Sequence, residues 1–342
     1  MDTTTHAAAE PNPALIFETL AAHNRTAALA TAIDLDLFRA IGEGIGDVPG
    51  LAQRVHASER GIRILCDYLV IMGLLTKSDG RYAHSPTSAV FLDPRSPASL
   101  ASTARFLGKP ELMKPFASLT EIVRTGRTVL EGDGTVTPEN PVWVEFAHSM
   151  APMMAPMAAP LAEVVLQGLD GPVQVLDIAA GHGLFGIEIL KQSPAAHTTA
   201  LDWAPVLEVA AANATRAGVA ERFSRLPGSA FDVPFGGPYD VILLTNFLHH
   251  FDQPTCVSLL RKAHDALTAR GRIAALEFVP NDDRVTPPMA AAFSMTMLAT
   301  TVSGDAYTLR EYDEMYRAAG FERAIGHPIP RAPSTIVVGF RD

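Results

Sequence analysis

The chain has 342 residues, of which 48% are hydrophobic and 19% are charged, and its formal net charge at pH 7 is −10. A chain of this length can bury a substantial core in two domains. The acidic balance argues against nucleic acid or an anionic membrane as the main partner, because either would require a basic face.

The cysteines and the N-terminus indicate the compartment. Cys66 and Cys256 lie far apart without a ligand motif, which favours two buried thiols in a reducing environment over a disulfide or a metal site. Residues 1–13 lack the basic start and the apolar stretch of a signal peptide, and we expect a short flexible arm. The apolar run at residues 64–75 contains Asp67 and is too short to span a bilayer. We therefore expect a cytoplasmic protein without membrane partner or metal.

Helical spacing dominates the first quarter of the chain. Residues 14–38 carry apolar side chains at intervals of three and four, which predicts two helices. Residues 47–75 predict a short helix and then a longer one with Ser58 as its N-cap. Two short runs around the turn formers Asp79 and Gly80 indicate a hairpin. Helices followed by a hairpin are typical of a winged helix.

Charge indicates what this region does. Between residues 1 and 105, nine Lys and Arg stand against eleven Asp and Glu, whereas a DNA-binding winged helix is normally basic. We therefore expect packing or dimerisation rather than DNA binding. We divide the chain into a winged-helix-like dimerisation domain at residues 1–105, connecting helices that contribute to a ligand pocket at 106–171, and an α/β domain at 172–342.

The connecting region is rich in methionine and proline. Met150, Met153, Met154 and Met157 alternate with three prolines. Methionine adapts to irregular shapes, so two interpretations stay open: core filling, or a flexible wall for a flat apolar ligand.

From residue 173 onward, buried strands alternate with helices. Strands are expected at residues 173–181, 197–202, 239–246 and 271–279, and helices at 182–193, 204–218 and 254–271, the last ending at Gly271. This alternation predicts a Rossmann-like, doubly wound and mainly parallel sheet.

A glycine-rich loop follows the first of these strands. Gly181, Gly183 and Gly186 form G-x-G-x-x-G, at a turn where a backbone approaches a ligand closely. Asp202 ends the next strand, where an acid accepts hydrogen bonds from ribose hydroxyls. NAD and S-adenosylmethionine both fit this pattern. Asp177 favours S-adenosylmethionine over NAD. A carboxylate there would repel the pyrophosphate of NAD but suits the ammonium and sulfonium groups of S-adenosylmethionine.

Two further positions belong to this region. Residues 228–232 come after the place where such a sheet has a third strand, between the expected strands at 197–202 and 239–246, and an adenine would lie there. Ala230 or Phe231 would cover its face, and a plain turn is the alternative. We interpret His182 as a tolerated loop position rather than a catalyst.

The sequence VLDIAAGHGLFG at residues 175–186 resembles the loop of class I S-adenosylmethionine-dependent methyltransferases. The order and spacing of the later elements resemble the two-domain O-methyltransferases, a family that includes caffeic acid, flavonoid and acetylserotonin O-methyltransferases and bacterial natural-product enzymes. The resemblance covers nearly the whole chain. It implies S-adenosylmethionine as cofactor, S-adenosylhomocysteine as product, a small-molecule acceptor, and a homodimer formed through the N-terminal domain.

The resemblance also implies the catalytic residues. His249 falls in the register of the family's catalytic histidine, and Glu277 lies where the family places a glutamate at the end of the next strand. A neutral histidine is a suitable acceptor for the proton of a phenol. Glu277 would fix its tautomer and stabilise the imidazolium.

Ligand contacts are carried over by position. The expected cofactor contacts are Asp177, Ala179, Gly181, Gly183, Asp202, Trp203, Ser229, Ala230, Phe231 and Thr245. The expected acceptor contacts are Met113, Phe146, Met150, Met154, Asn246, His250 and Met297.

Several positions depart from the plant members of the family. Ser229 and Thr245 replace an acid and a lysine, and Asn246 replaces an aromatic residue, so plant acceptors are not expected. His250 stands where relatives usually carry an acid. Asp305 is only a nearby candidate for a second glutamate that flanks the histidine in many plant enzymes.

The leading expectation is therefore O-methylation of a hydroxyl, a phenolic one by preference, on a small aromatic or polycyclic metabolite of secondary metabolism. Transfer to carbon or nitrogen is an alternative that the same base would serve. A catalytically inactive, S-adenosylmethionine-binding regulator is a second alternative, which the acidic N-terminal region disfavours.

Overall fold

The computed structural model describes residues 11–341, which form two compact units, one reaching Lys109 and the other beginning at Pro110. The first ten residues of the expected N-terminal arm lie outside the described residues. Of residues 106–171, which we expected to connect two domains, 106–109 belong to the first unit and 110–171 group with the α/β region in the second.

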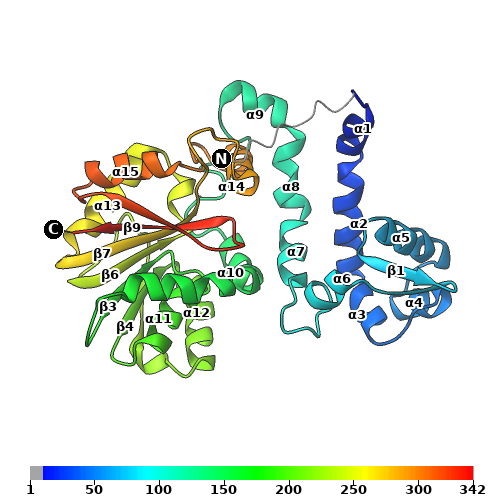
Figure 1. Ribbon diagram of the computed structural model, residues 1–342, viewed down its shortest axis with the longest axis horizontal. Coiled ribbons are helices and arrows are strands. Elements are labelled where there is room, and N and C mark those ends of the chain that lie inside the picture. The colour runs from blue at the N-terminus through cyan, green and yellow to red at the C-terminus, as the bar shows by residue number, and fades with distance from the viewer. Residues whose placement is uncertain (1–10, 342) are drawn as a thin grey trace, which may run out of the picture. The chain divides into compact units, whose positions relative to one another are not determined.

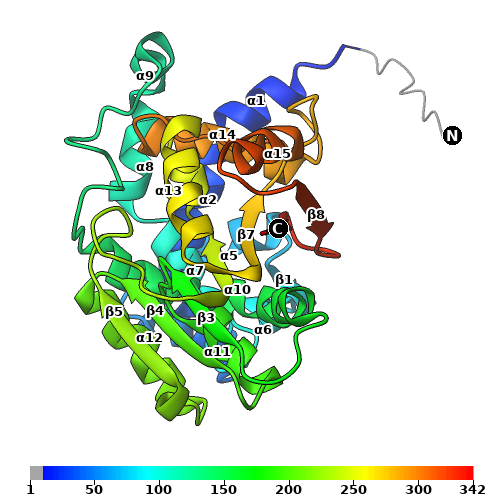
Figure 2. The same ribbon diagram turned by 90° about the vertical axis from the view of Figure 1, so that its left-hand side faces the viewer.

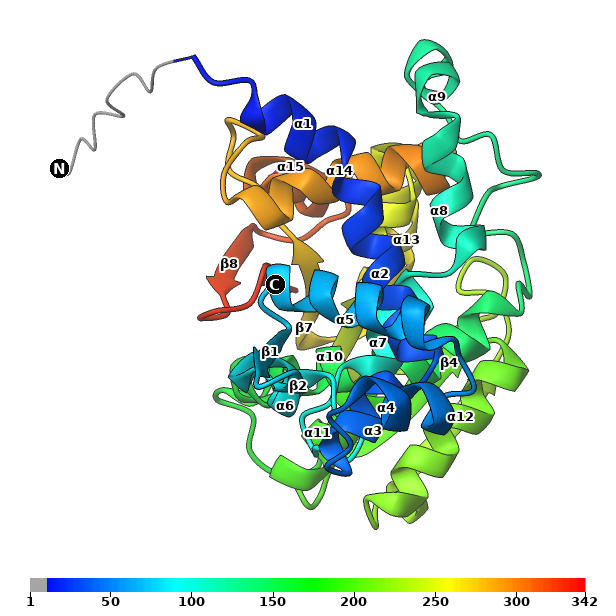
Figure 3. The ribbon, with the colours of Figure 1, turned by 90° about the vertical axis from the view of Figure 1, so that its right-hand side faces the viewer.

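The first unit is helical with one hairpin (Figure 3). Its elements are α1 (Ala14–Leu20), α2 (Ala22–Asp34), α3 (Leu37–Gly42), α4 (Val48–Arg54), α5 (Glu59–Ile71), β1 (Leu75–Ser78), β2 (Arg81–His84), α6 (Pro86–Phe91) and α7 (Ala101–Leu107). The hydroxyl of Ser58 accepts a hydrogen bond from the N–H of Gly61 and caps α5 as expected. The core includes Phe38, Leu51 and Leu69.

The two helices expected over residues 14–38 are wrong in number, because three helices occur there. The chain breaks at Asp36, whose φ of 56° is left-handed. An aspartate adopts this conformation more readily than most residues. Its carboxylate also accepts a hydrogen bond from Nε of Arg39, so the break has a local partner that apolar spacing does not reveal.

The second unit contains a seven-stranded sheet in the order β5-β4-β3-β6-β7-β9-β8. The strands are β3 (Gln174–Ile178), β4 (His197–Asp202), β5 (Phe223–Pro227), β6 (Tyr239–Thr245), β7 (Leu267–Phe278), β8 (Ala324–Pro328) and β9 (Ser334–Phe340). The first five are parallel neighbours, and β9 runs antiparallel to both β7 and β8. Figure 2 shows β5, β4 and β3 in this order.

Helices cover both faces of this sheet. The helices of the second unit are α8 (Pro110–Ala117), α9 (Leu119–Thr125), α10 (Val142–Leu166), α11 (Leu184–Gln192), α12 (Ala204–Arg216), α13 (Gln253–Asp265), α14 (Pro288–Thr300) and α15 (Leu309–Ala318), with short 3-10 turns η1 (Ala220–Arg222) and η2 (Leu248–His250). Of these, α8 and α9 pack against α14. Figure 1 shows α10, α11 and α12 on one face and α13 and α15 on the other. The mainly parallel sheet with helices on both sides confirms the predicted fold class.

Strand order places the ligand-binding edge. The chain runs from β3 outward to β4 and β5, and then returns to β6 on the other side of β3. Ligands of such sheets bind at the carboxyl ends of the strands where the order reverses. The functional region is therefore expected beyond the ends of β3, β4 and β6.

Helix α10 is long and apolar enough, by length and composition, to cross a membrane. It is instead a core helix of the second unit, because Leu161 and Val165 are fully buried and the helix packs against α11 and α12. Met150, Met154 and Met157 are buried along it. Core filling therefore describes most of the methionine run.

The helix expected over residues 254–271 ends too late. Helix α13 ends at Asp265, and β7 begins at Leu267, so Gly271 lies inside the strand. Leu267 pairs with Tyr239 of β6, and the carbonyl of Gly271 accepts a hydrogen bond from the N–H of Arg341. Sheet pairing with distant segments has overridden the local helical pattern.

Close packing of α15 on β9 generates a stability prediction. A Cβ on Gly339 would overlap the ring of Tyr316, whose hydroxyl donates a hydrogen bond to the carbonyl of Val337. We expect Gly339→Ala to lower the free energy of unfolding by roughly 1–3 kcal/mol, as overpacked core positions do. Chemical denaturation of the full chain measures this, and an unchanged midpoint would contradict the packing.

Candidate active site

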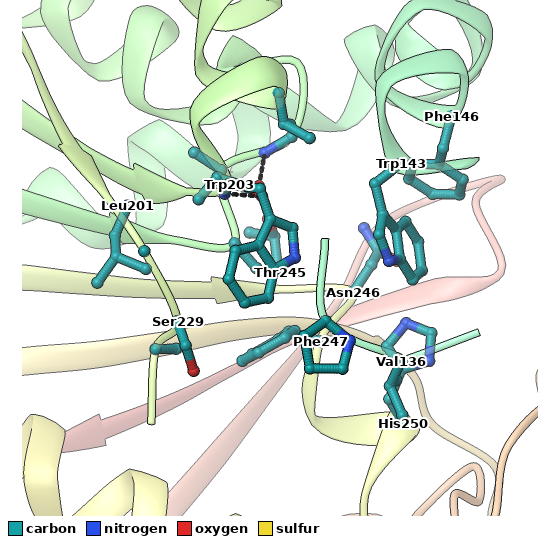
Figure 4. Close-up of a pocket in the computed structure, with 18 of the residues that line it drawn as sticks. Val136, Trp143, Phe146, Leu201, Trp203, Ser229, Thr245, Asn246, Phe247 and His250 are labelled. Atoms are coloured by element: carbon teal, nitrogen blue, oxygen red, sulfur yellow. Dashed lines mark hydrogen bonds between the residues drawn. The ribbon is translucent and has the colours of Figure 1, made fainter. Parts of the chain in front are cut away.

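A cavity of about 390 Å³ lies at the carboxyl ends of β3, β4 and β6. Five strand-end segments line it, at residues 179–182, 201–203, 228–232, 245–247 and 250–251. Trp143, Phe146 and Met154 of α10 line another part of the wall, together with Val136, Pro138 and Glu139. Figure 4 shows Leu201 and Ser229 at one end and Trp143, Asn246 and His250 at the other.

The glycine-rich loop requires its small residues for packing and backbone shape. Gly183 has a left-handed φ of 72°, and a Cβ there would lie 2.9 Å from Cβ of Ala210 on α12. A Cβ on Gly186 would lie 2.6 Å from Cγ2 of Thr198 on β4. The loop therefore sits close to both neighbouring elements, and its backbone at residues 179–182 faces the cavity.

Asp202 joins the end of β4 to this loop. Its carboxylate accepts hydrogen bonds from the N–H of Gly181 at 2.8 Å and of Trp203 at 2.7 Å (Figure 4). Burial raises the pKa of Asp202 to about 6, against the lowering effect of these two N–H groups. The residue lines the cavity, so its carboxylate is placed to accept a further hydrogen bond from a ligand.

Asp177 lies behind the loop instead of on the cavity wall. It is 0% exposed, and its Oδ2 accepts a hydrogen bond from the N–H of Gly186 at 3.2 Å. Its Oδ1 has no partner among the described residues. Burial, with a smaller contribution from the charge of Asp202, raises the pKa of Asp177 to about 7. Its carboxyl group therefore lies beneath the glycine loop, behind the cavity wall.

Apart from Asp177 and Gly183, every expected cofactor contact lines the cavity. Those residues are Ala179, Gly181, Asp202, Trp203, Ser229, Ala230, Phe231 and Thr245. His182, interpreted as a tolerated position, lines it as well. Burial lowers the pKa of His182 to about 4, and its Nδ1 accepts a hydrogen bond from the N–H of Leu184, so the ring is neutral near pH 7.

Glu277 and His249 form a buried pair next to the cavity. Oε1 of Glu277 accepts hydrogen bonds from the N–H of Phe247 at 3.0 Å and of Leu248 at 2.9 Å. Oε2 of Glu277 bonds to Nδ1 of His249. The two side chains are 0% and 4% exposed, respectively. The orientation of the His249 ring is thus set by a carboxylate that the backbone itself holds in place.

The two adjacent histidines occupy different environments. His249 faces Glu277 and forms a T-shaped pair with Phe293, and it does not line the cavity. His250 lines the cavity, and its ring centroid lies 4.4 Å from that of His249. Asn246, with a left-handed φ of 53°, turns the chain from β6 into the segment that carries both rings.

Asp305 does not flank the ring of His249. Its Oδ2 pairs with Arg284 at 3.1 Å, and its Oδ1 accepts a hydrogen bond from the N–H of Ala306. Its backbone N–H donates to the carbonyl of His249 at 3.0 Å. Asp305 therefore supports the backbone of the histidine, and Glu277 is the carboxylate on its ring.

The expected acceptor contacts divide into two groups. Phe146, Met154, Asn246 and His250 line the cavity. Met150 and Met297 are buried elsewhere, and Met113 on α8 is 42% exposed.

Sequence reasoning missed Trp143, Phe247 and Phe251 on the cavity wall. Trp143 was recognisable, because it lies three residues before Phe146 on the same face of α10. No comparable local signal marks Phe247 or Phe251, whose positions depend on the turn after β6. Within residues 11–341, no group of three or more His, Cys, Asp or Glu side chains is arranged to hold a metal ion.

Two family models match the chain. Residues 140–322 match the O-methyltransferase domain, and residues 17–94 match the O-methyltransferase dimerisation domain.

Similar proteins support the same grouping. The crystal structure of an inferred O-methyltransferase from Nostoc punctiforme is 47% identical, with a TM-score of 0.93 over 97% of this chain and 100% of that one. The 3-hydroxy-5-methyl-1-naphthoate 3-O-methyltransferase of Streptomyces sahachiroi is 29% identical over 86% of each chain. PigF with bound S-adenosylhomocysteine is 25% identical, with a TM-score of 0.83 over 97% of this chain and 100% of that one.

The position of Asp202 generates a ligand-binding prediction. Hydrogen bonds to a charged group contribute about 1.5–3 kcal/mol. Asp202→Asn should therefore raise the Kd for S-adenosylhomocysteine roughly 10- to 100-fold in calorimetric titration. Glu208→Gln, an exposed acid of α12 paired with Arg225, makes the same charge change and should leave the Kd unchanged. Equal Kd values for Asp202→Asn and the unaltered chain would contradict the assignment.

The raised pKa of Asp177 generates a prediction about pH. The folded chain keeps the proton up to about pH 7, whereas the unfolded chain releases it near pH 4, about its reference value. Stability from this group is therefore present at low pH and is lost as pH rises through that window. The asparagine of Asp177→Asn cannot ionise. The thermal midpoint of this variant, relative to that of the parent chain, should therefore rise between pH 5 and pH 8. Parallel pH curves for the two proteins would show that Asp177 is not the group responsible.

Proposed function

This chain belongs to the O-methyltransferase family and uses S-adenosylmethionine, and from that premise we propose that it methylates a phenolic hydroxyl of a small aromatic or polycyclic metabolite, with His249 as the general base. The observation that carries the proposal is the buried His249–Glu277 pair beside a cavity rich in aromatic side chains.

The cavity suits the cofactor that the family uses. Backbone at residues 179–182 is open to close approach, and Asp202 offers an acceptor to a ribose hydroxyl. Asp177 adds a carboxyl group behind the loop, and its ionised form favours a cation over a phosphate. When bound, S-adenosylmethionine supplies a methyl group on a sulfonium centre, which is a good leaving group.

His249 is placed to remove the proton of the acceptor. A phenol has a pKa near 10, so forming its anion at pH 7 costs about 4 kcal/mol. Because Nδ1 of His249 bonds to the carboxylate of Glu277, Nδ1 carries the ring proton in the neutral form and Nε2 presents a lone pair. Nε2 is therefore the ring nitrogen that can take up the proton of a hydroxyl.

Glu277 acts through His249. As Nε2 takes up the proton, the ring becomes an imidazolium, and the adjacent carboxylate stabilises that charge. Its second oxygen stays bonded to the N–H groups of Phe247 and Leu248, so the carboxylate needs no rearrangement during the reaction.

The end of the cavity near Trp143 suits an aromatic acceptor. Trp143 and Phe146 form an edge-to-face pair with ring centroids 5.3 Å apart, and Met154 lies on the same wall. Such surfaces favour flat apolar rings. The Streptomyces relative is named for a hydroxynaphthoate, which has this shape.

We also propose that the protein is a cytoplasmic homodimer, since residues 17–94 match the dimerisation domain of the family. Light scattering on the purified chain measures the oligomeric state. A monomer at micromolar concentration would contradict this part of the proposal.

The base assignment is tested by paired substitutions. His249→Gln should lower kcat by a factor of about 10² to 10⁴, the usual contribution of a general base, with an unchanged Kd for S-adenosylhomocysteine. Glu277→Gln would place an N–H opposite Nδ1 of His249, which shifts the ring proton to Nε2 and should cause a similar loss. His197→Gln, at an exposed histidine where β4 begins, serves as control.

The readouts are methylated product by mass spectrometry and calorimetric binding of S-adenosylhomocysteine. Full turnover by His249→Gln would show that another group removes the proton. Nuclear magnetic resonance of the product identifies the bond formed, and a new C–CH₃ or N–CH₃ bond would contradict O-methylation.

A further inference from the structure

Two buried polar atoms on the cavity wall have no partner among the described residues, Oδ1 of Asn246 and Nδ1 of His250. Leaving a buried polar atom unpaired costs roughly 1–3 kcal/mol. The other unpaired buried atoms belong to Asp177, Arg272 and Tyr312, and none of these residues lines the cavity. The two cavity atoms are therefore the ones that a ligand can satisfy.

Asn246 is held so that its oxygen is the free group. Its left-handed backbone follows the last residue of β6, and its N–H donates to the carbonyl of Leu276 at 2.8 Å. The side-chain Nδ2 points to Sδ of Met154 at 3.7 Å. The remaining atom, Oδ1, can only accept a hydrogen bond, so its missing partner must be an O–H or N–H group.

His250 is held as a neutral ring. Trp143 forms a T-shaped pair with it, with ring centroids 5.5 Å apart, and the ring centroid of His249 lies 4.4 Å away. Burial, followed by the proximity of His249, keeps the pKa of His250 well below its usual range. A neutral imidazole offers one donor and one acceptor. It can therefore pair with a hydroxyl, but it provides no positive charge for a carboxylate.

The position of these atoms indicates which ligand they meet. Asn246 and His250 lie at the Trp143 end of the cavity, away from Leu201 and Ser229 (Figure 4). Under the proposed function, the end near the glycine loop and Asp202 holds the cofactor. The unpaired atoms therefore face the methyl acceptor, next to the histidine that takes its proton.

We propose that Asn246 and His250 form a recognition pair for an uncharged O–H or N–H group placed close to the methylated hydroxyl of the acceptor. The inference rests on the proposed function for the identity of the ligand. Asn246 accepts from this second group, and His250 completes its hydrogen bonding. An acceptor with a carboxylate in the same place is disfavoured. The carboxylate oxygens would face the oxygen of Asn246, and neither Asn246 nor the neutral ring of His250 carries a positive charge to balance them.

Three probes differ only at the position beside one hydroxyl: 2-naphthol, 2,3-dihydroxynaphthalene and 3-hydroxy-2-naphthoate. Their Kd values are measured by calorimetry on the full chain saturated with S-adenosylhomocysteine. We expect the diol to bind at least about 10-fold more tightly than the naphthol, which corresponds to one additional satisfied hydrogen bond. We expect the naphthoate to bind more weakly than the naphthol.

Two substitutions remove one member of the pair each. Asn246→Gly keeps the left-handed backbone accessible, and His250→Phe keeps a ring between Trp143 and His249. Each should reduce the diol-to-naphthol ratio of affinities to within about 3-fold of unity. His197→Gln should keep the ratio of the parent chain. If His250→Phe fails to fold by circular dichroism, Asn246→Gly alone decides.

Equal binding of diol and naphthol by the parent chain, a full diol preference in the folded variants, or preference for the naphthoate would each overturn the recognition pair. Failure of all three probes to bind would do the same. Turnover with S-adenosylmethionine is measured separately. The expected affinity ratios without any methylated product would refute the proposed reaction and leave the recognition pair standing.

Discussion

The buried carboxylate of Glu277 is the group on which the site depends. Its oxygens bind the N–H groups of Phe247 and Leu248 and Nδ1 of His249. This arrangement exists because β6 and β7 are parallel neighbours, so the turn after β6 closes over the end of β7. A buried carboxylate without partners costs several kcal/mol. One acid therefore secures the turn, the strand end and the orientation of the proposed base.

A second pair of acids organises the other half of the cavity. Asp202 at the end of β4 holds the N–H groups of Gly181 and Trp203, while Asp177 at the end of β3 holds that of Gly186. Asp177 is buried and Asp202 is partly buried, and both have raised pKa values, yet only Asp202 reaches the cavity. The glycine loop is thus supported from below by one acid and joined to the ligand space by the other.

Sequence periodicity predicted the sheet and its helices, because each face of these elements meets one environment along its length. It predicted the cap of α5 through Ser58 for the same local reason. It did not predict that α13 stops at Asp265 or that β7 starts at Leu267, since residues near Tyr239 and Arg341 provide the competing hydrogen bonds. Contacts between segments that are distant in the chain produce no periodic pattern in the sequence.

By itself, the sequence determined the fold class, the glycine loop and the spacing that links a histidine to Glu277. These features depend on residue types and their spacing along the strands and the turns that follow them, which can be read directly from the chain. Only the tertiary structure decided which neighbours the ring of each adjacent histidine faces. His249 turns to a carboxylate from the neighbouring strand, and His250 turns to the cavity, where its Nδ1 and Oδ1 of Asn246 stay unpaired. Side-chain direction in that short turn is set by partners from other elements, and those partners exist only once the sheet has formed.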